Sequence, residues 1–192
     1  MPTNPQKKSF YDDINSVETP SKEELTAKSE ILAWIKEAEV LFRISKNPDT
    51  PNKHACFYGI LVDKRSGVTK LALFEHKKSG LILPPGGHLD ANETPFECVK
   101  REMYEELGIT ESEVTFPQKP FYLSTLDTST SGFHIELWYL IDVDKDLDFT
   151  RGVDYFAEYT SHDWYTIDEI KALKRTTPTM PGFIKKLEMM NL

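Results

Sequence analysis

The sequence predicts an α/β fold in which several strands surround a central helix, with a helical extension ahead of them. Apolar runs of strand length alternate with turn-rich segments from residue 54 onward. A helix with its own start and stop signals covers residues 95–107, and a long amphipathic stretch precedes the first strand. A chain of 192 residues, 39% hydrophobic and 28% charged, suits one domain with a terminal extension.

The first 50 residues are expected to form the N-terminal extension. Residues 1–20 contain three prolines and scattered charge with little periodicity, which predicts a loosely ordered start. Ser21 and Glu24 then form a capping box that opens one long amphipathic helix to about residue 44, and two prolines follow it. This helix either packs on its own domain, covers a substrate cleft or pairs with a second subunit in a homodimer. The general tendency of amphipathic helices favours the first of these alternatives.

The strands are expected in the rest of the chain. Residues 55–62 form a nearly continuous apolar run, which indicates a central strand covered on both faces. Further strands are expected over residues 70–76, 81–83, 121–126, 134–143 and 158–165, and short helices over 167–173 and 181–190. Turn residues separate these elements at 64–67, 77–80 and 127–132.

The helix over residues 95–107 has the clearest local signals in the chain. Thr94 followed by Glu97 is a capping box, Pro95 stands at the first helical position, and Gly108 supplies the stop. Its apolar face is predicted from four residues at helical spacing: Phe96, Val99, Met103 and Leu107.

Glu102, Glu105 and Glu106 stand at positions i, i+3 and i+4 of this helix, so their carboxylates project from one face. Like charges at this spacing repel, and Arg101 supplies one cation against three anions. A hard divalent cation such as Mg²⁺ or Mn²⁺ offsets this repulsion, because it binds oxygen ligands and joins carboxylates to substrate phosphates. The loop 84–87 before the helix contains two glycines, which allow a ligand to approach its backbone. The pattern therefore indicates metal-assisted phosphate chemistry; an acidic solvated face is the alternative.

Gly87, Glu93 and the run 101–109 together resemble the Nudix box at its fixed spacing, with every specified position filled. The resemblance implies a MutT-like Nudix hydrolase, an enzyme that cleaves a diphosphate linkage in a nucleoside diphosphate joined to a further group. It also implies an α/β/α sandwich with a mixed sheet. The matching part runs from Lys53 to Leu192, so we expect a Nudix domain over residues 51–192.

The resemblance also implies roles for individual residues. Glu105 and Glu106 match metal ligands, Glu102 matches a ligand with a share in base catalysis, and the Gly86 carbonyl matches a backbone oxygen of the metal shell. The metal implied is Mg²⁺ or Mn²⁺. The other box positions, Gly87, Glu93 and Arg101, match structural residues, with Glu93 and Arg101 bracing the loop against the helix.

A second resemblance, to later strands of MutT-type members, rests on residues 134–139 and on Asp163-Trp164. In those members a further acidic ligand precedes the tryptophan, and Glu158 is the nearest candidate, on a loop facing the helix. A solvated loop acid is the alternative interpretation of Glu158. Glu136 and Asp154 are the next candidates.

Three residues are candidate substrate contacts. His88 follows Gly87 directly and can bond a phosphate oxygen or a metal-bound water, although a histidine with a structural bond is the alternative. Lys53 and Lys77 lie near strand ends, where they either steer an anionic substrate or are simply solvated. The other four histidines show no metal-ligand spacing: His54, His76, His134 and His162.

Charge and cysteine content limit the class of protein. A net charge of −8 argues against a duplex nucleic acid as partner, which requires a basic face. No apolar run approaches the length of a membrane span. Cys56 and Cys98 are too few for a disulfide framework, so we expect reduced thiols and a cytoplasmic location.

The substrate is not specified by the box. MutT-like enzymes that remove oxidised guanine nucleotides use an Asn near the last helix, and this chain has none there before Asn191. Two alternatives to a hydrolase share the fold. Isoprenoid diphosphate isomerases use a catalytic cysteine and a histidine-containing metal site on the strands, and regulatory modules usually lack box carboxylates. The complete box favours hydrolysis over both.

Overall fold

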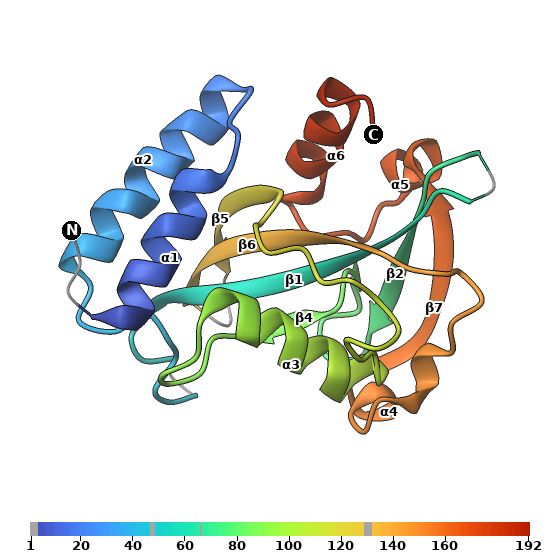
Figure 1. Cartoon of the computed structure of the whole chain (residues 1–192), viewed down its shortest axis with the longest axis horizontal. Helices are drawn as coiled ribbons and strands as arrows, with labels where there is room; N and C mark the ends of the chain where they lie inside the picture. Colours follow the sequence, from blue (N-terminus) through green and yellow to red (C-terminus); the bar gives the residue numbers. More distant parts are fainter. Residues whose placement is uncertain (1–3, 47–48, 66, 129–131) are drawn as a thin grey trace. The chain divides into compact units, whose positions relative to one another are not determined.

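The computed structural model describes residues 4–46, 49–65, 67–128 and 132–192 (Figure 1). The chain divides into two compact units, and each is described by itself. Unit 1 comprises Met1–Tyr58, Gly87–Val99 and Gln118–Tyr139. Unit 2 comprises Gly59–Gly86, Lys100–Pro117 and Leu140–Leu192.

Unit 1 begins with helix α1 (Pro5–Ser16), so the expectation of a loosely ordered start was wrong. Asn4 caps this helix by accepting a hydrogen bond from the Lys7 N–H at 3.2 Å, and Pro5 takes the first helical position. Phe10 and Ile14 are fully buried on one face. The proline at residue 5 is therefore a start signal for a helix rather than a sign of disorder.

Helix α2 (Lys22–Glu37) is capped by Ser21 as predicted, through a hydrogen bond of 3.1 Å from the Glu24 N–H. It ends at Glu37 instead of near residue 44, so the extension holds two helices rather than one long helix. Tertiary partners take the backbone groups beyond its end. Lys7 Nζ donates to the Ala38 carbonyl, and the carbonyl of the buried Leu41 accepts from the Ala55 N–H at 2.8 Å.

Both helices pack within unit 1, as the favoured alternative for the extension predicts. They lie side by side in blue in Figure 1. The Phe10 ring lies edge-on to Trp34 of α2 and to Phe57 of the first strand, with ring centroids 6.2 Å and 5.8 Å apart. Gln6 of α1 donates to the Asp90 and Glu93 carbonyls at 2.9 Å and 2.8 Å, so this helix also holds the loop before α3.

The strands of unit 1 match the predicted ones closely. β1 (Lys53–Asp63) is flanked by β4 (Gly86–His88) and β6 (Gly132–Asp142), and β6 pairs in antiparallel register with β5 (Tyr122–Thr128). The register runs from Tyr122 opposite Trp138 to Thr128 opposite Gly132. The predicted turn over 127–132 is shorter, because both strands extend into it; its residues 129–131 lie outside the described residues.

In unit 2, β2 (Lys70–His76) pairs antiparallel with three strands: the end of β1, β3 (Ile82–Leu83) and β7 (Tyr159–Thr166). The antiparallel pair β2–β7 is the most extended of these, and Figure 1 shows the two strands side by side. The predicted turn after β1 includes Ser66, which lies outside the described residues. The remaining helices are η1 (Phe149–Arg151), α4 (Tyr155–Glu158), α5 (Ile167–Ala172) and α6 (Met180–Met189).

Helix α3 (Pro95–Leu107) has the predicted bounds. The Glu97 carboxylate accepts from the Thr94 N–H at 2.8 Å, and the Thr94 hydroxyl accepts from the Glu97 N–H at 3.3 Å, so the capping box is confirmed. Gly108 ends the helix with φ +71°, a conformation that favours glycine. The residues Lys100–Leu107 belong to unit 2.

Gly152, after η1, allows the chain to pass directly against the last turns of α3. A Cβ atom at this position would lie 2.1 Å from the Glu106 carbonyl oxygen and 2.4 Å from the Leu107 nitrogen. Its φ of −62° suits any residue, so close approach of two backbones, rather than backbone conformation, requires the glycine.

We predict that Gly152→Ala lowers the free energy of unfolding by about 2 kcal/mol or more, because backbone cannot give way as a flexible side chain can. Gly67→Ala is the control: nothing lies within 4 Å of its added Cβ, and only its φ of +76° is unfavourable. That variant should cost about 1 kcal/mol. Urea unfolding measures both, and equal costs would contradict the steric explanation.

Candidate active site

The three predicted carboxylates lie on the last turns of α3 in unit 2. Glu102 and Glu106 are buried, whereas the Glu105 side chain is 41% exposed. Arg101 Nη1 lies between two of them, 2.9 Å from Glu102 Oε1 and 3.1 Å from Glu105 Oε2. One guanidinium therefore pairs with two carboxylates.

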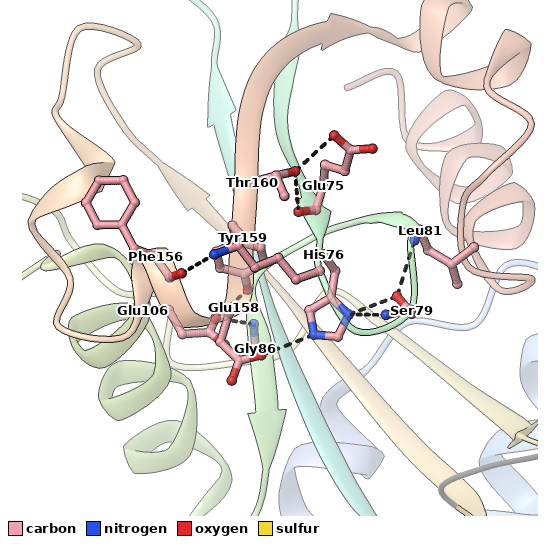
Figure 2. Close-up of polar contacts among 11 residues, drawn as sticks. Glu75, His76, Ser79, Leu81, Gly86, Glu106, Phe156, Glu158, Tyr159 and Thr160 are labelled. Carbon is pink, nitrogen blue, oxygen red and sulfur yellow. Dashed lines mark hydrogen bonds and ion pairs between the residues drawn. The ribbon is translucent and has the colours of Figure 1, made fainter.

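Glu106 is held by two donors that come from outside the helix (Figure 2). Its Oε2 atom accepts from the Gly86 N–H at 2.9 Å and from the Tyr159 hydroxyl at 2.7 Å. Burial, and then the neighbouring charge of Glu102, raise the pKa of Glu106 from an ordinary 4.5 to about 8, although both hydrogen bonds act in the opposite direction. An anion at this position is therefore costly unless a cation accompanies it.

Glu158 is the last residue of α4, immediately before β7, and not on a loop as expected. Its Oε2 atom lies 3.2 Å from His76 Nε2 (Figure 2). Its carbonyl accepts from the Lys77 N–H at 2.8 Å. The charge of Glu158 is among the causes that raise the pKa of Glu106. Glu158 thus belongs to the electrostatic surroundings of the α3 carboxylates.

The two next candidates for the further acidic ligand lie in different surroundings. Asp154 is exposed, and its backbone N–H donates to the Glu105 carbonyl at 2.9 Å. Glu136 is fully buried in unit 1, where its carboxylate accepts from Ser124 Oγ at 2.6 Å. The assignment of the further acidic ligand among Glu158, Asp154 and Glu136 stays a prediction.

The lysines predicted as substrate contacts have partners within their own units. Lys77 Nζ donates to the Phe156 carbonyl in unit 2. Lys53 Nζ lies over two aromatic rings in unit 1, 5.6 Å from the Trp34 centroid and 4.7 Å from the Phe133 centroid. Their substrate-binding roles stay predictions.

Among the box residues predicted to be structural, Glu93 accepts from the Asp90 N–H at 3.0 Å within the loop before α3. Gly87 lies in the short strand β4. Arg101 pairs with Glu102 and Glu105, a role that was not predicted for it. Its predicted role, bracing the loop against the helix together with Glu93, stays a prediction.

His88 lies in unit 1 beside the imidazoles of His54 and His134. Burial is the main cause that lowers the pKa of His88 to about 2, and the nearby Arg43 and His134 add to it. Its side chain and those of His54, Cys56 and His134 offer ligand atoms that all lie within 4.8 Å of one another. Spacing along the sequence therefore did not reveal that His54 and His134 come together in the structure.

Two features of the sites were missed from the sequence. For the histidine–cysteine group one signal was present, because His54 and Cys56 are two residues apart on a strand and so share a face. His88 and His134 join them only through the pairing of β4 and β6 with β1, which spacing along the chain does not reveal. For Tyr159 no local signal existed, since its contact to Glu106 spans 53 positions of sequence.

The part of the chain that the structure describes contains no helix long and apolar enough to cross a membrane.

The α3 carboxylates, Glu158 and the backbone of Gly86 form an oxygen-rich, anionic set of the kind that hard divalent cations prefer. The donor set of unit 2 therefore fits Mg²⁺ or Mn²⁺.

A helix with three carboxylates on one face, preceded by a glycine-containing loop and set among strands, defines the class of Nudix-fold proteins. The profile of the NUDIX domain matches residues 51–187, and the chain belongs to this family. A search of curated protein sequences finds no significant match.

Solved structures share the fold at low sequence identity. An Ap4A hydrolase from C. elegans is 17% identical, with 71% of this chain and 96% of that chain covered and a TM-score of 0.59. A MutT protein from Methanosarcina mazei is 19% identical, with 72% and 95% covered and a TM-score of 0.58. The NUDIX domain of Shewanella oneidensis NrtR, complexed with ADP ribose, is 12% identical, with 72% and 88% covered and a TM-score of 0.55. The predicted Nudix fold, with helices ahead of it, is confirmed.

We predict a pH dependence of stability that comes from Glu106. Because the folded pKa is raised to about 8, the folded state retains a proton that the unfolded chain loses near pH 4.5. Glu106 therefore contributes stability that is fully present below pH 4.5 and is lost as the pH rises through about 8. In the presence of a chelator, the free energy of unfolding should fall over this range by on the order of a few kcal/mol.

The variant Glu106→Gln isolates this contribution, because other titrating groups remain the same. Urea unfolding at pH 5 and pH 9 gives the difference between wild type and variant at each pH. A difference that does not change between the two pH values would contradict the assignment of a raised pKa to Glu106.

Proposed function

We propose that the protein is a Nudix pyrophosphohydrolase that depends on a divalent metal and cleaves a diphosphate linkage in a nucleoside diphosphate derivative. The observation that carries the proposal is the gathering of Glu102, Glu105 and Glu106 beside Gly86, on a complete box. A surface helix would place such carboxylates in water, whereas two of these three are buried.

We assign Glu102, Glu105, Glu106, the Gly86 carbonyl and Glu158 to the metal. Mg²⁺ or Mn²⁺ bound there would supply positive charge to the diphosphate oxygens. The raised pKa of Glu106 supports the assignment, because a buried carboxylate next to Glu102 is most stable as an anion when a cation is near.

The chain's own residues orient this set. The Tyr159 hydroxyl and the Gly86 N–H fix the Glu106 carboxylate by two hydrogen bonds to one oxygen, which leaves Oε1 available. Arg101 keeps Glu102 and Glu105 together. We assign Glu102 a share in base catalysis as well as in metal binding, because its box position matches this role in the family. The base accepts a proton from the attacking water.

The neighbours and the charge of the chain support a substrate class. The C. elegans neighbour is a hydrolase of Ap4A and the NrtR domain binds ADP ribose, and both compounds are nucleotides with diphosphate linkages. We propose a small nucleoside diphosphate derivative of this kind, contacted by Lys77 near Glu158. With a net charge of −8 we expect no duplex nucleic acid as partner. The buried thiols Cys56 and Cys98 suit the proposed cytoplasmic location.

A panel assay tests the proposal. The protein is incubated with Mg²⁺ or Mn²⁺ and with dinucleoside polyphosphates, ADP ribose, sugar nucleotides, nucleoside triphosphates and isoprenoid diphosphates. Metal-dependent release of a nucleoside monophosphate or of diphosphate supports the hydrolase. Double-bond migration in the isoprenoid would overturn it in favour of an isomerase, and tight binding without turnover would favour a regulatory module.

Cys56 is 1% exposed, which disfavours the isomerase because its catalytic cysteine must reach the substrate.

We predict that Glu106→Gln lowers turnover by roughly 100-fold or more, because a metal ligand is lost. At pH 9, where Glu106 is ionised in the folded protein, thermal stability without metal should stay the same or rise, since the variant then lacks one of three crowded anions. Glu105→Gln should behave similarly.

Glu111→Gln is the matched control in the same unit, because the Glu111 side chain is 65% exposed and pairs with Lys100. Its turnover should match wild type. Steady-state rates at saturating metal, together with melting temperatures in chelator, separate the two effects. Unchanged turnover in Glu106→Gln would exclude the proposed ligand role.

A further inference from the structure

The histidine–cysteine group of unit 1, formed by His54, Cys56, His88 and His134, has the geometry of a metal site. The three imidazoles form a nearly equilateral triangle, with ring centroids 4.9, 5.1 and 5.2 Å apart. One ligand atom from each residue lies within 4.8 Å of the other three. Four nitrogen and sulfur donors thus converge on one point of the unit.

We propose that these four residues bind a transition-metal ion of the Zn²⁺ type, in a closed four-coordinate site that stabilises unit 1. The site is additional to the carboxylate site of α3 and does not depend on the proposed hydrolase function. Its ligands are of a different chemical kind, so the two sites would take different ions.

Ligand chemistry selects the ion. Imidazole and thiolate donors suit Zn²⁺ and related transition metals, whereas Mg²⁺ and Ca²⁺ prefer oxygen. Zinc bound to nitrogen at about 2.0 Å and to sulfur at about 2.3 Å in a tetrahedron places its ligands roughly 3.3–3.6 Å apart. The group therefore needs a contraction of about 1 Å to reach this geometry, which small side-chain rotations supply.

The backbone prepares His54 for this role. Its Nδ1 atom lies 3.0 Å from the Pro51 carbonyl, which can only accept a hydrogen bond. The proton is therefore on Nδ1, and Nε2 keeps the lone pair that a metal needs. A ring N–H bonded to a backbone carbonyl is the usual outer contact of a metal-binding histidine.

Three strands hold the group together. His54 and Cys56 share one face of β1, and the Leu89 N–H after β4 bonds to the Ala55 carbonyl at 3.2 Å. The Phe133 N–H, next to His134, bonds to the Asn52 carbonyl at 2.7 Å. The ligands therefore come from rigid neighbouring backbone rather than from separate loops.

Burial indicates a structural site rather than a catalytic one. His54 is fully buried, Cys56 is 1% exposed and His134 is 6% exposed, whereas His88 is half-buried. Four protein donors complete the coordination of Zn²⁺ and leave no position for water or substrate. The Asp49 carboxylate lies 3.8 Å from His54 Nε2, and Arg43, 3.3 Å from Asp49, balances its charge. Binding converts the Cys56 thiol to a thiolate, and its proton goes to solvent.

The test uses the full chain, stripped of metal and then loaded with Zn²⁺ or Co²⁺. Elemental analysis after dialysis should find about one zinc per chain, and the zinc form should melt at a higher temperature than the stripped form. Cobalt should give the intense visible absorption of four-coordinate Co²⁺ and a thiolate-to-metal charge-transfer band. His134→Ala should lose the visible band, and Cys56→Ser should lose the charge-transfer band.

Two matched controls locate the ion. Cys98→Ser removes the other buried thiol of the same unit, and Glu106→Gln removes a carboxylate of α3; both should keep the cobalt spectrum. Circular dichroism of Cys56→Ser and His134→Ala checks that these variants fold. Should either variant fail to fold, protection of Cys56 from alkylation by Zn²⁺ in the wild type replaces it.

Three outcomes would overturn the proposal. The first is an absence of bound zinc or cobalt in the wild type. The second is a charge-transfer band that survives Cys56→Ser. The third is a cobalt spectrum that disappears in Glu106→Gln, which would assign the ion to the carboxylates. None of these depends on turnover, so a failure of the proposed hydrolase activity would leave this proposal intact.

Discussion

The constraint on which unit 2 depends is the crowding of negative charge at the end of α3. Three carboxylates within five residues of one helix repel each other, and two of them are buried. Specific donors contact these carboxylates. Arg101 pairs with Glu102 and Glu105, and the Gly86 N–H and the Tyr159 hydroxyl donate hydrogen bonds to Glu106. These contacts hold the carboxylates in place but do not neutralise them.

This arrangement explains why other parts of unit 2 are built as they are. Tyr159 begins β7, whose long pairing with β2 fixes the position of its hydroxyl. Glu158 precedes it and adds to the negative potential that raises the pKa of Glu106. Gly152 lets the chain after η1 cross the backbone of α3 closely, which brings α4 to the same helix.

The sequence predicts local structure well where the signals are local. The bounds of α3 follow from a capping box, a proline at the first position and a terminal glycine, all of which act within one helical turn. The strands follow from apolar runs. Helix α1 was missed because the three prolines of residues 1–20 were counted as disorder, although Asn4 and Pro5 together form a start signal. The end of α2 could not be predicted, because Lys7, from another helix, takes a backbone carbonyl there.

The same distinction applies to the sites. Glu102, Glu105 and Glu106 could be predicted because helical spacing alone places them on one face. Tyr159 and the partners of His54 could not, since strand pairing brings them together across long stretches of sequence. A residue's role is readable from a single sequence when its partners lie within a few positions. It is hidden when the partners belong to other strands.

The contact of Gln6 with the loop before α3 shows that the N-terminal extension supports part of the Nudix domain. The matched domain starts at residue 51, yet a side chain from α1 bonds the carbonyls of Asp90 and Glu93. The domain as the family defines it is therefore not the whole folding unit of this chain. A fragment trimmed to residues 51–187 would lack an anchor for one of its own box loops and would uncover Phe57.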